Sequence, residues 1–358
     1  YMPDVEAFWP VYESSSQAIN VIFQFIHIWR MPLFFILSGF FARLIISKKS
    51  WKGWWRNRAL RIGLPIVVFF PIMSLTLPWI FKYGWTGDFE FFYSDEGQPF
   101  HLWFLWHLMM FVIFTAIFRL PYILGSGVLN RHELSSLGRM AHKLGSISTG
   151  ILFRTRFPVL FIIFCYVVSL PTQGELIVNP VATGLYFSIG YTFYRNTHLF
   201  SFLKAHWRYY FFIGLVGFIL YMVLESRHQV TNIYIDELTG EAYLRAISEP
   251  FTAVKVFIKV TCGLLFSYSF IGLSEARFSS YNAKLRFVSD GAYWMYLIHL
   301  PVVAAITFLM FRLHMPIEIK FGIAIVMTSI CCLVTYKYLV RSTFIGLLLN
   351  GKRHPFRS

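Results

Sequence analysis

The sequence predicts an all-α protein, a polytopic integral membrane helix bundle. Hydrophobic residues make up 57% of the 358 positions and charged residues only 14%, whereas soluble domains contain roughly 25% charged residues. The apolar residues gather in stretches of about 20, the length that crosses the hydrocarbon core of a membrane as a helix. A lipid bilayer is therefore the first predicted partner.

Nine apolar stretches are read as helices, of which the fourth and fifth are short. They are 19–46, 62–81, 102–120, 157–171, 180–194, 209–224, 251–273, 292–312 and 319–340. We treat them as a single membrane-embedded domain over residues 1–358. No internal repeat is visible in the sequence, which argues against the inverted-repeat transporter folds.

The charges of the connections predict the orientation of the chain. The first connection is basic and has no acid (Arg43, Lys48, Lys49, Lys52, Arg56, Arg58 and Arg61), whereas the second is acidic (Asp88, Glu90, Asp95 and Glu96). This alternation continues to the basic C-terminal tail. Because basic loops face the cytoplasm, the first residues lie outside and the C-terminus lies in the cytoplasm. The net charge of +15 then reflects membrane orientation, and no nucleic-acid partner is expected.

The start of the sequence suggests an N-terminal truncation. Residue 1 is a tyrosine, and neither a basic segment nor a signal-type apolar core precedes the first stretch. One more helix upstream would place both ends in the cytoplasm. We therefore expect ten helices in the full-length protein, of which this chain holds the last nine.

The first candidate site is the stretch FIHIWRMPLFFILSGFF at 25–41. His27, Arg30 and Ser38 project from one side of a helix, within about 80°. An ionisable side chain near mid-bilayer costs on the order of 2.5–3.5 kcal/mol, so it indicates a polar cavity or pathway. Ser38 and Gly39 would let another backbone or a thin ligand approach closely. The alternative is a helix-packing notch beside a buried histidine and arginine.

The second candidate is Arg58 and Arg61, just before Pro65. Two arginines three residues apart share a helix face and could hold a phosphate through paired hydrogen bonds. The positive-inside rule alone would also place basic residues here.

The third candidate is the segment HLWFLWH, with His101, Trp103 and His107 at the outer end of a span. Indole faces stack well on sugar rings, which favours the wall of an outer vestibule. An aromatic belt at the membrane surface is the alternative.

The fourth candidate is Tyr296 and His299, which share a helix face in the segment YLIHLP. An imidazole beside a phenol is suited to proton transfer at pH 7, and a histidine that only packs between helices is the alternative. The spans also contain prolines that each free a backbone carbonyl, which other protein groups must then bond. They are Pro32, Pro65, Pro71, Pro78 and Pro301.

The four cysteines all lie inside apolar stretches. They are Cys165, Cys262, Cys331 and Cys332. Without a CxxC spacing or a nearby metal-ligand pattern, we expect reduced core residues and no metal site.

Five stretches, in this order, resemble the acyltransferase-3 family of bacterial membrane enzymes, and within it the glucan biosynthesis protein C group. They are FIHIWRMPLFFILSGFF, the pattern WxxRxxRIGLP at 55–65, HLWFL at 101–105, YLIHLP at 296–301 and LxNGK at 348–352. The resemblance covers nearly the whole chain.

The resemblance implies an enzyme of the bacterial inner membrane that moves an acyl group, such as succinyl or acetyl, from cytoplasmic acyl-CoA to a hydroxyl of an extracytoplasmic glycan. Acyl-CoA would be the donor, with no permanently bound cofactor. Arg58 and Arg61 would bind the CoA phosphates, and Arg30 the thioester or the acyl carboxylate. Trp103 and its neighbours would receive the sugar.

The family's first helix carries an arginine and a histidine that are central to catalysis, and this sequence as read lacks that helix. His27, His299 and Tyr296 are therefore expected to orient groups, relay a proton or stabilise an oxyanion, and the chain alone is expected to be inactive. Two other functions remain open: a transporter or flippase lined by the intramembrane His and Arg residues, and a sensor or scaffold without chemistry.

Overall fold

The computed structural model describes residues 16–88, 91, 100–129, 158–194, 196–226, 233–235, 242–244, 251–310 and 313–351. The acidic residues Glu90, Asp95 and Glu96 and the tail from Lys352 onward lie outside this part of the chain. Nearly all described residues are helical, and a short antiparallel hairpin pairs β1 (Ile233–Ile235) with β2 (Ala242–Leu244).

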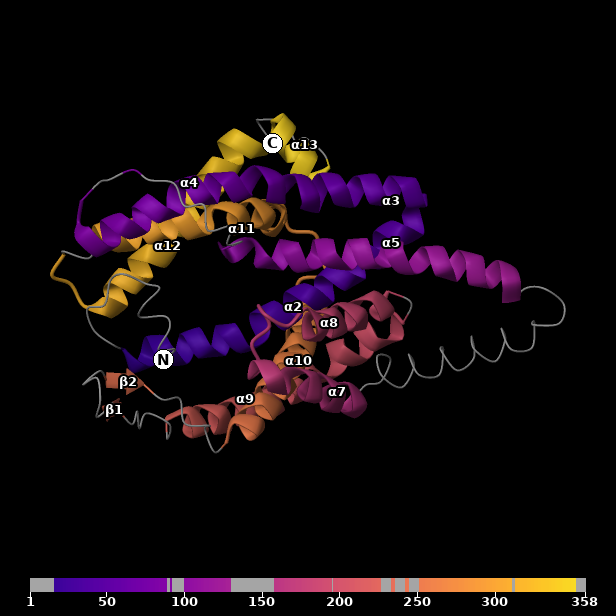
Figure 1. Cartoon of the computed structure of the whole chain (residues 1–358), viewed down its shortest axis with the longest axis horizontal. Coiled ribbons are helices and arrows are strands. Elements are labelled where there is room, and N and C mark those ends of the chain that lie inside the picture. The colour runs from indigo at the N-terminus through magenta and orange to yellow at the C-terminus, as the bar shows by residue number, and fades with distance from the viewer. Residues whose placement is uncertain are drawn as a thin grey trace. The chain divides into compact units, whose positions relative to one another are not determined.

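Each of the nine predicted stretches contains a helix (Figure 1). In chain order these are α2 (Gln17–Lys48), α4 (Leu64–Thr86), α5 (Trp103–Leu129), α7 (Val159–Ser169), α8 (Pro180–Phe193), α9 (His198–Ser226), α10 (Thr252–Arg277), α11 (Ala283–Met310) and α12 (Ile317–Thr335). Shorter elements join them: α3 (Trp51–Arg58), the π-helices η1 (Ala59–Gly63) and η4 (Tyr336–Val340), the 3-10 turns η2 (Phe100–Leu102) and η3 (Leu170–Thr172), and α13 (Phe344–Asn350).

Six helical segments of the described chain are long and apolar enough to cross a membrane. They are Gln17–Lys48, Trp51–Gly84, His198–Ser226, Thr252–Arg277, Ala283–Met310 and Ile317–Val340. The chain is thus a multi-pass membrane protein with a helical fold, as predicted. The count of nine crossings remains a prediction, because α7 and α8 have 11 and 14 residues and a helix rises only about 1.5 Å per residue.

The outward faces of the helices are apolar. Val67 on α4 and Val216 on α9 are each 69% exposed, and many other large hydrophobic side chains are exposed on the same helices. A water-soluble protein rarely presents such continuous apolar surface. Lipid is the solvent that these faces suit.

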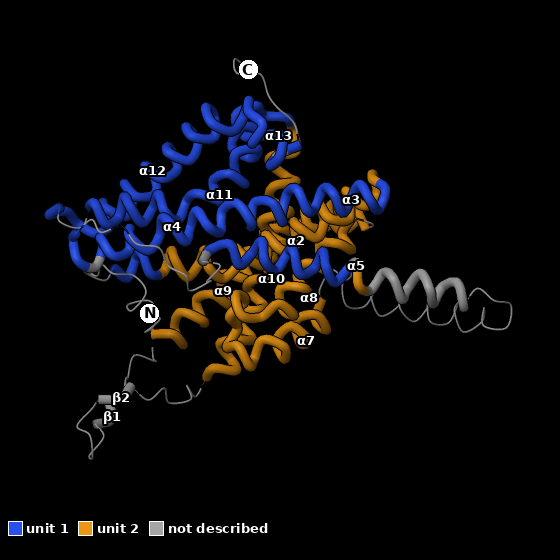
Figure 2. The backbone as a smooth tube through the Cα atoms, turned by 45° about the horizontal axis from the view of Figure 1, so that its top comes forward, with its two compact units in different colours: residues 1–20, 50–116, 281–358 blue, residues 21–49, 117–280 orange. Residues whose placement is uncertain are grey.

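The chain divides into two compact units, each built from segments far apart in the sequence (Figure 2). Unit 1 contains residues 1–20, 50–116 and 281–358, and unit 2 contains residues 21–49 and 117–280. Each unit is described by itself below. The predicted single domain remains a prediction.

Unit 2 is built around α10, which packs against α9 and α7. Half of its residues are buried, and Cys262 and Phe266 form a core cluster with Ile28 of α2 and Phe218 of α9. The four cysteines of the sequence are all free, and three of them are buried. All four lie in helices as predicted, and Cys331 is the one that is only half-buried.

Glycines bring α2 and α8 into direct backbone contact. A Cβ added at Gly39 would lie 1.9 Å from the Phe187 carbonyl oxygen, and one added at Gly190 would lie 1.7 Å from the Ile36 carbonyl oxygen. Such close crossings replace the hydrophobic effect as a source of helix association in lipid. The sequence predicted that either another backbone or a thin ligand would approach Gly39. In the structure it is another backbone, that of α8.

Unit 1 is built around α11, which packs against α12 on one side and α4 on another. Edge-to-face ring contacts join α4 to α11, with Phe69 5.9 Å from Trp294 and Phe81 5.4 Å from Phe308 between ring centroids. The indole N–H of Trp294 donates to the hydroxyl of Thr335 at 3.0 Å, which ties α11 to α12.

Helix ends that the charge pattern assigns to one membrane side also meet in space within unit 2. Arg43 Nη1 donates to the Tyr191 hydroxyl at 3.0 Å, and the Ser47 hydroxyl donates to Tyr194 at 2.8 Å. Both contacts join the predicted cytoplasmic end of the first span to the predicted cytoplasmic end of the fifth span. The alternation of sides is therefore consistent in this unit, while the choice of the cytoplasmic side rests on the charge rule.

Gly190→Ala is expected to lower the free energy of unfolding by about 1–3 kcal/mol, the usual cost of overpacking. The added methyl group meets the Ile36 carbonyl, and neither backbone can withdraw easily. Denaturant unfolding in detergent micelles measures the effect. Gly322→Ala in α12 is the matched control, because nothing lies within 4 Å of that position. Equal losses in the two variants would contradict the close crossing of α2 and α8.

Candidate functional site

Three polar residues of α11 lie at intervals of three along the helix: Tyr293, Tyr296 and His299. At about 1.5 Å per residue they span about 9 Å of the helix axis. The first bonds Arg61 of η1, just before α4, and the other two contact His101 of η2, just before α5. They define two polar clusters within unit 1: the arginine cluster (Arg58, Arg61 and Tyr293) and the imidazole cluster (His101, Tyr296 and His299).

The arginine cluster depends on Pro65. Proline has no N–H, so the carbonyl of Arg61, four residues earlier, lacks its usual helical partner. The chain widens there into the π-helix η1, in which the Leu64 N–H donates to the Ala59 carbonyl. The hydroxyl of Tyr293 then donates to the Arg61 carbonyl. A proline in α4 therefore determines where α11 attaches.

The two arginine side chains have different surroundings. The guanidinium of Arg61 lies against Gly351, the αL residue that ends α13, where an added Cβ would clash with it. A cation is favourable at this position because helix C-termini carry partial negative charge. Arg58 donates from Nη2 to the Asn57 side chain at 3.1 Å, while its buried Nε has no hydrogen-bond partner.

The imidazole cluster depends on a second proline. Pro301 removes the N–H that would bond the Leu297 carbonyl, and His101 Nε2 lies 3.2 Å from that oxygen. Since a carbonyl only accepts, Nε2 carries the proton in the neutral ring. Nδ1 of His101 is then the lone-pair nitrogen, and it is buried without a hydrogen-bond partner.

Tyr296 and His299 complete this cluster. The Tyr296 hydroxyl donates to the backbone carbonyl of His101, and the His299 ring lies 5.0 Å from the His101 ring at 82°. His299 Nδ1 donates to the Tyr296 carbonyl at 2.8 Å, which leaves Nε2 as its lone-pair nitrogen in the neutral ring. Two imidazoles in contact, each fixed by a carbonyl, are suited to accepting and passing a proton.

Trp103 and His107 lie one turn apart on α5, with ring centroids 5.3 Å apart. His107 is buried inside unit 1, whereas Trp106 between them is 54% exposed. Trp103 is half-buried. The structure therefore brings His101 of the turn η2 into the imidazole cluster and places Trp103 and His107 on α5, which follows that turn.

The residues predicted on α2 belong to unit 2. The packed face of α2 includes Ile28 and Phe35, and His27, Arg30 and Ser38 lie to one side of it. His27 is half-buried and stacks on Phe23 at 5.5 Å, and its buried Nδ1 has no hydrogen-bond partner. Arg30 is exposed and Ser38 is half-buried.

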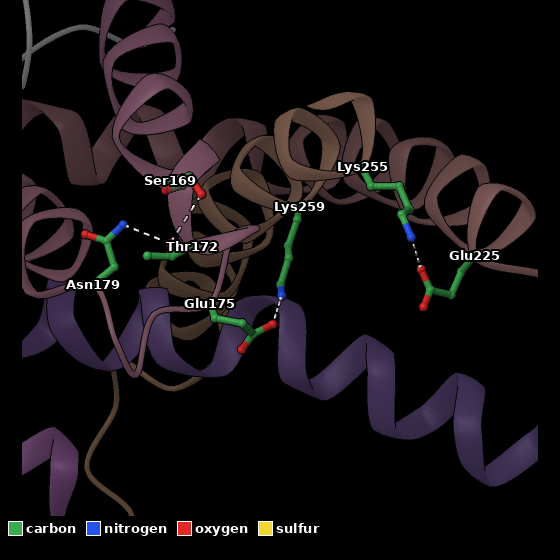
Figure 3. Close-up of polar contacts among 7 residues, drawn as sticks. All are labelled: Ser169, Thr172, Glu175, Asn179, Glu225, Lys255 and Lys259. Carbon is green, nitrogen blue, oxygen red and sulfur yellow. Dashed lines mark hydrogen bonds and ion pairs between the residues drawn. The ribbon is translucent and has the colours of Figure 1, made fainter. Parts of the chain in front are cut away.

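Beside His27 is a group that the sequence analysis did not identify, the lysine cluster (Lys255, Lys259, Glu175 and Glu225). Lys259 of α10 forms an ion pair with Glu175, and Lys255 forms one with Glu225 at 3.1 Å (Figure 3). The charges of Lys259 and Glu175 are close enough to act on the His27 ring. The signal was available, because two lysines four residues apart inside an apolar span are as unusual as His27 and Arg30.

A tight turn holds Glu175 in place. Buried Asn179 caps α8 by accepting from the Ala182 N–H at 2.9 Å, and it donates to the Thr172 hydroxyl at 3.1 Å (Figure 3). Gly174 takes a positive φ of 79° with the Lys259 side chain against it, so a side chain there would be strained and crowded. The turn sequence thus positions the partner of Lys259.

These observations define a class of protein. It is a helical membrane protein in which one unit holds two imidazoles in contact and a pair of arginines. A family model described as an acyltransferase domain, acyltransferase-3, matches residues 5–337. The chain belongs to this family. The match runs through both units.

Similar proteins include the glucans biosynthesis protein C of Salmonella paratyphi B, of Salmonella heidelberg and of Salmonella agona. Each is 29% identical over 99 residues, which is 26% of this chain and 26% of the relative. The matched region thus spans about a quarter of the length of these relatives. No solved structure matches the chain.

Tyr293→Phe is expected to lower the free energy of unfolding by about 1–3 kcal/mol, because the Arg61 carbonyl loses its donor. Pro65→Ala restores a backbone N–H for that carbonyl, so Tyr293→Phe should cost less in the Pro65→Ala background. Unfolding of the four proteins in detergent forms a double-mutant cycle. Tyr281→Phe, at a position 84% exposed, is the control. Equal costs in both backgrounds would refute the role of Pro65.

Lys259→Met is expected to destabilise unit 2 by leaving Glu175 without its cation. The side chains are 17% and 30% exposed, so the cost should lie between the ~1 kcal/mol of an exposed pair and the ~3–5 kcal/mol of a buried one. Adding Glu175→Gln should recover part of the loss. Arg286→Ala breaks a pair with Asp290 within one turn of a helix, in which the arginine side chain is 51% exposed, and should cost under ~0.5 kcal/mol. No recovery in the double variant would argue against the ion pair.

Proposed function

We propose that this protein is a membrane O-acyltransferase that moves an acyl group from cytoplasmic acyl-CoA to a hydroxyl of an extracytoplasmic carbohydrate. The observation that carries the proposal is the imidazole cluster, in which His101, Tyr296 and His299 meet within a unit that also holds Arg58 and Arg61. Membership of the acyltransferase-3 family supports the reaction class.

The reaction is an exchange of one bond for another. The acceptor oxygen bonds to the acyl carbon, the carbon–sulfur bond breaks, and the hydroxyl proton ends on the released CoA thiol. A group that takes this proton as the oxygen attacks lowers the barrier, and imidazole is suited to the task near neutral pH. His299 and His101 can supply such a group, with Tyr296 holding the two chain segments together.

The donor is expected at the arginine cluster. Arg58 and Arg61 lie in the connection that the charge pattern assigns to the cytoplasm, where acyl-CoA is made available. Guanidinium groups bind phosphate through paired hydrogen bonds, and the buried Nε of Arg58 is a donor without a partner. The positive charge of Arg61 adds to the attraction while it also contacts the end of α13.

The acceptor is expected beside Trp103 on α5, and the bonds from His101 to α11 place this segment within about two turns of Tyr293 and the arginine cluster, not at an outer membrane surface as predicted. The half-buried ring of Trp103 offers an apolar face of the kind that stacks on sugars, and His107 supports it from inside the unit. The name of the Salmonella relatives, glucans biosynthesis protein C, suggests a glucan as the acceptor. Succinyl and acetyl are the acyl groups to test.

A second candidate function is transport, and the lysine cluster is the observation that favours it. Ionisable residues inside membrane spans frequently line substrate or ion pathways. Lys255, Lys259 and their acidic partners lie on unit 2 together with His27. Flux of a glycan or acyl carrier through proteoliposomes without ester formation would decide for transport.

The test is acyl transfer by the purified full-length protein in nanodiscs, with radiolabelled succinyl-CoA or acetyl-CoA and an oligoglucan. His299→Ala is expected to lower kcat by about 10²–10⁴, the usual contribution of a proton-transferring group. Arg58→Ala should mainly raise KM for acyl-CoA. His314→Ala and Lys52→Ala, at exposed positions, are the matched controls and should retain activity. Unaltered activity in both His299→Ala and Arg58→Ala would refute the proposal.

A further inference from the structure

The end of the short helix α13 lies against the arginine cluster of unit 1. We propose that Gly351 is a positioning residue: it leaves the space in which the guanidinium of Arg61 lies, and so holds that cation ready for a phosphate group of the acyl donor. The inference rests on the proposed function for the phosphate, and on geometry alone for the position of Arg61. Gly351 belongs to the stretch LxNGK at 348–352, the part of the family resemblance that the proposed reaction leaves without a role.

The first step is the backbone at the end of α13. Gly351 has a φ of 77° and a ψ of 9°, and its N–H donates to the Leu347 carbonyl at 2.9 Å. This left-handed conformation closes many helices, and residues other than glycine and asparagine rarely adopt it. The backbone alone would therefore accept either a glycine or an asparagine at this position. The surroundings decide between the two.

The second step is the space beside Gly351. A Cβ added there would overlap Nη2 of Arg61, and it would also lie within 4 Å of Cζ and Nε of the same side chain. Its three nearest neighbours are thus all atoms of one guanidinium group. Because any residue with a Cβ would occupy this place, asparagine is excluded together with every other side chain. Only the missing side chain of glycine lets the guanidinium lie against α13.

The third step is that Arg61 is held at both ends. The Tyr293 hydroxyl of α11 donates to its backbone carbonyl, and its guanidinium lies against the end of α13. A helix C-terminus carries partial negative charge, which favours a cation there. Fixing a long arginine side chain costs rotamer entropy. When the protein has already fixed the side chain, a ligand can bind to it without that cost.

The fourth step is that the held cation stays accessible. Arg61 is only half-buried, and Arg58 lies three residues before it. A guanidinium presents its N–H donors in a fixed fork that matches the oxygens of a phosphate. A phosphate bound by these arginines would meet one guanidinium whose position is already set. Gly351 would then raise the affinity for the donor through Arg61 and without touching the donor.

The position of Arg61 is tested without any substrate, by the rate at which phenylglyoxal modifies its guanidinium in the full-length protein, followed by mass spectrometry. In Gly351→Ala the displaced group no longer lies against α13, so the rate should rise. Gly87→Ala is the matched control. Gly87 ends α4 with a φ of 79°, and its N–H donates to the Tyr83 carbonyl at 2.8 Å. It therefore introduces the same backbone strain at the far end of α4, and the rate at Arg61 should not change.

The role in binding is tested with adenosine 3′,5′-bisphosphate, a phosphate-bearing fragment of CoA. Gly351→Ala should raise its Kd by about 2- to 10-fold, the effect of a long side chain that the ligand must now order. Gly351→Asn tolerates the left-handed backbone but adds a Cβ, so it should raise the Kd equally. The KM for acyl-CoA should rise while kcat is retained. In an Arg61→Ala background Gly351→Ala should have no further effect on the Kd, because Gly351 acts through Arg61.

The possible failures are distinguishable. A phenylglyoxal rate that does not rise in Gly351→Ala overturns the position assigned to Arg61. If Arg61→Ala weakens bisphosphate binding and Gly351→Ala does not, the positioning role is overturned and the proposed donor site stands. If Arg61→Ala leaves the Kd unchanged, the proposed donor site fails and the role of Gly351 in binding fails with it. An equal rise of the Kd in Gly87→Ala, or additive losses in the double variant, would assign the effect to backbone strain instead. Should Gly351→Ala fail to fold, Gly351→Asn provides the same comparisons.

Discussion

The structure depends on one constraint, that a backbone carbonyl inside a membrane must be satisfied by the protein itself. Proline breaks the regular ladder of a helix and frees the carbonyl four residues earlier. Two freed carbonyls bind side chains from elsewhere in the chain: Arg61 takes the hydroxyl of Tyr293, and Leu297 takes the imidazole of His101. The carbonyl of Ile28, freed by Pro32, instead lies against Gly263 of α10.

These hydrogen bonds also determine where the arginine cluster and the imidazole cluster lie along α11. Because α11 reaches α4 through Tyr293 and the start of α5 through Tyr296, its polar face runs between the arginine cluster and the imidazole cluster of unit 1. A donor bound at the arginines and a hydroxyl bound at the imidazoles would then meet along one helix. The same hydrogen bonds that replace lost helical ones thus orient the groups that could act on a substrate.

In unit 2 the buried polar groups are charged, and ion pairs offset the free-energy cost of burying them. Lys255 and Lys259 carry their charges into a span, and the acidic partners Glu225 and Glu175 come from the end of α9 and from the turn before α8. Removing one member of such a pair is costly because the other charge stays buried. His27 lies close enough to one of these pairs for its charges to act on the imidazole ring.

The sequence by itself determined the helices and the need for partners. All nine stretches contain helices, because only long apolar helical segments can cross a bilayer with their backbone groups bonded. The positions of the prolines predicted which backbone carbonyls lack a helical partner. Only the tertiary structure decided which groups bond to these carbonyls. His101 and Leu297 are 196 residues apart in the sequence, and Tyr293 and Arg61 are 232 apart. It likewise filled the notch at Gly39 with α8 and paired Lys259 with Glu175. Such contacts follow from how helices pack, which no local pattern of residues records.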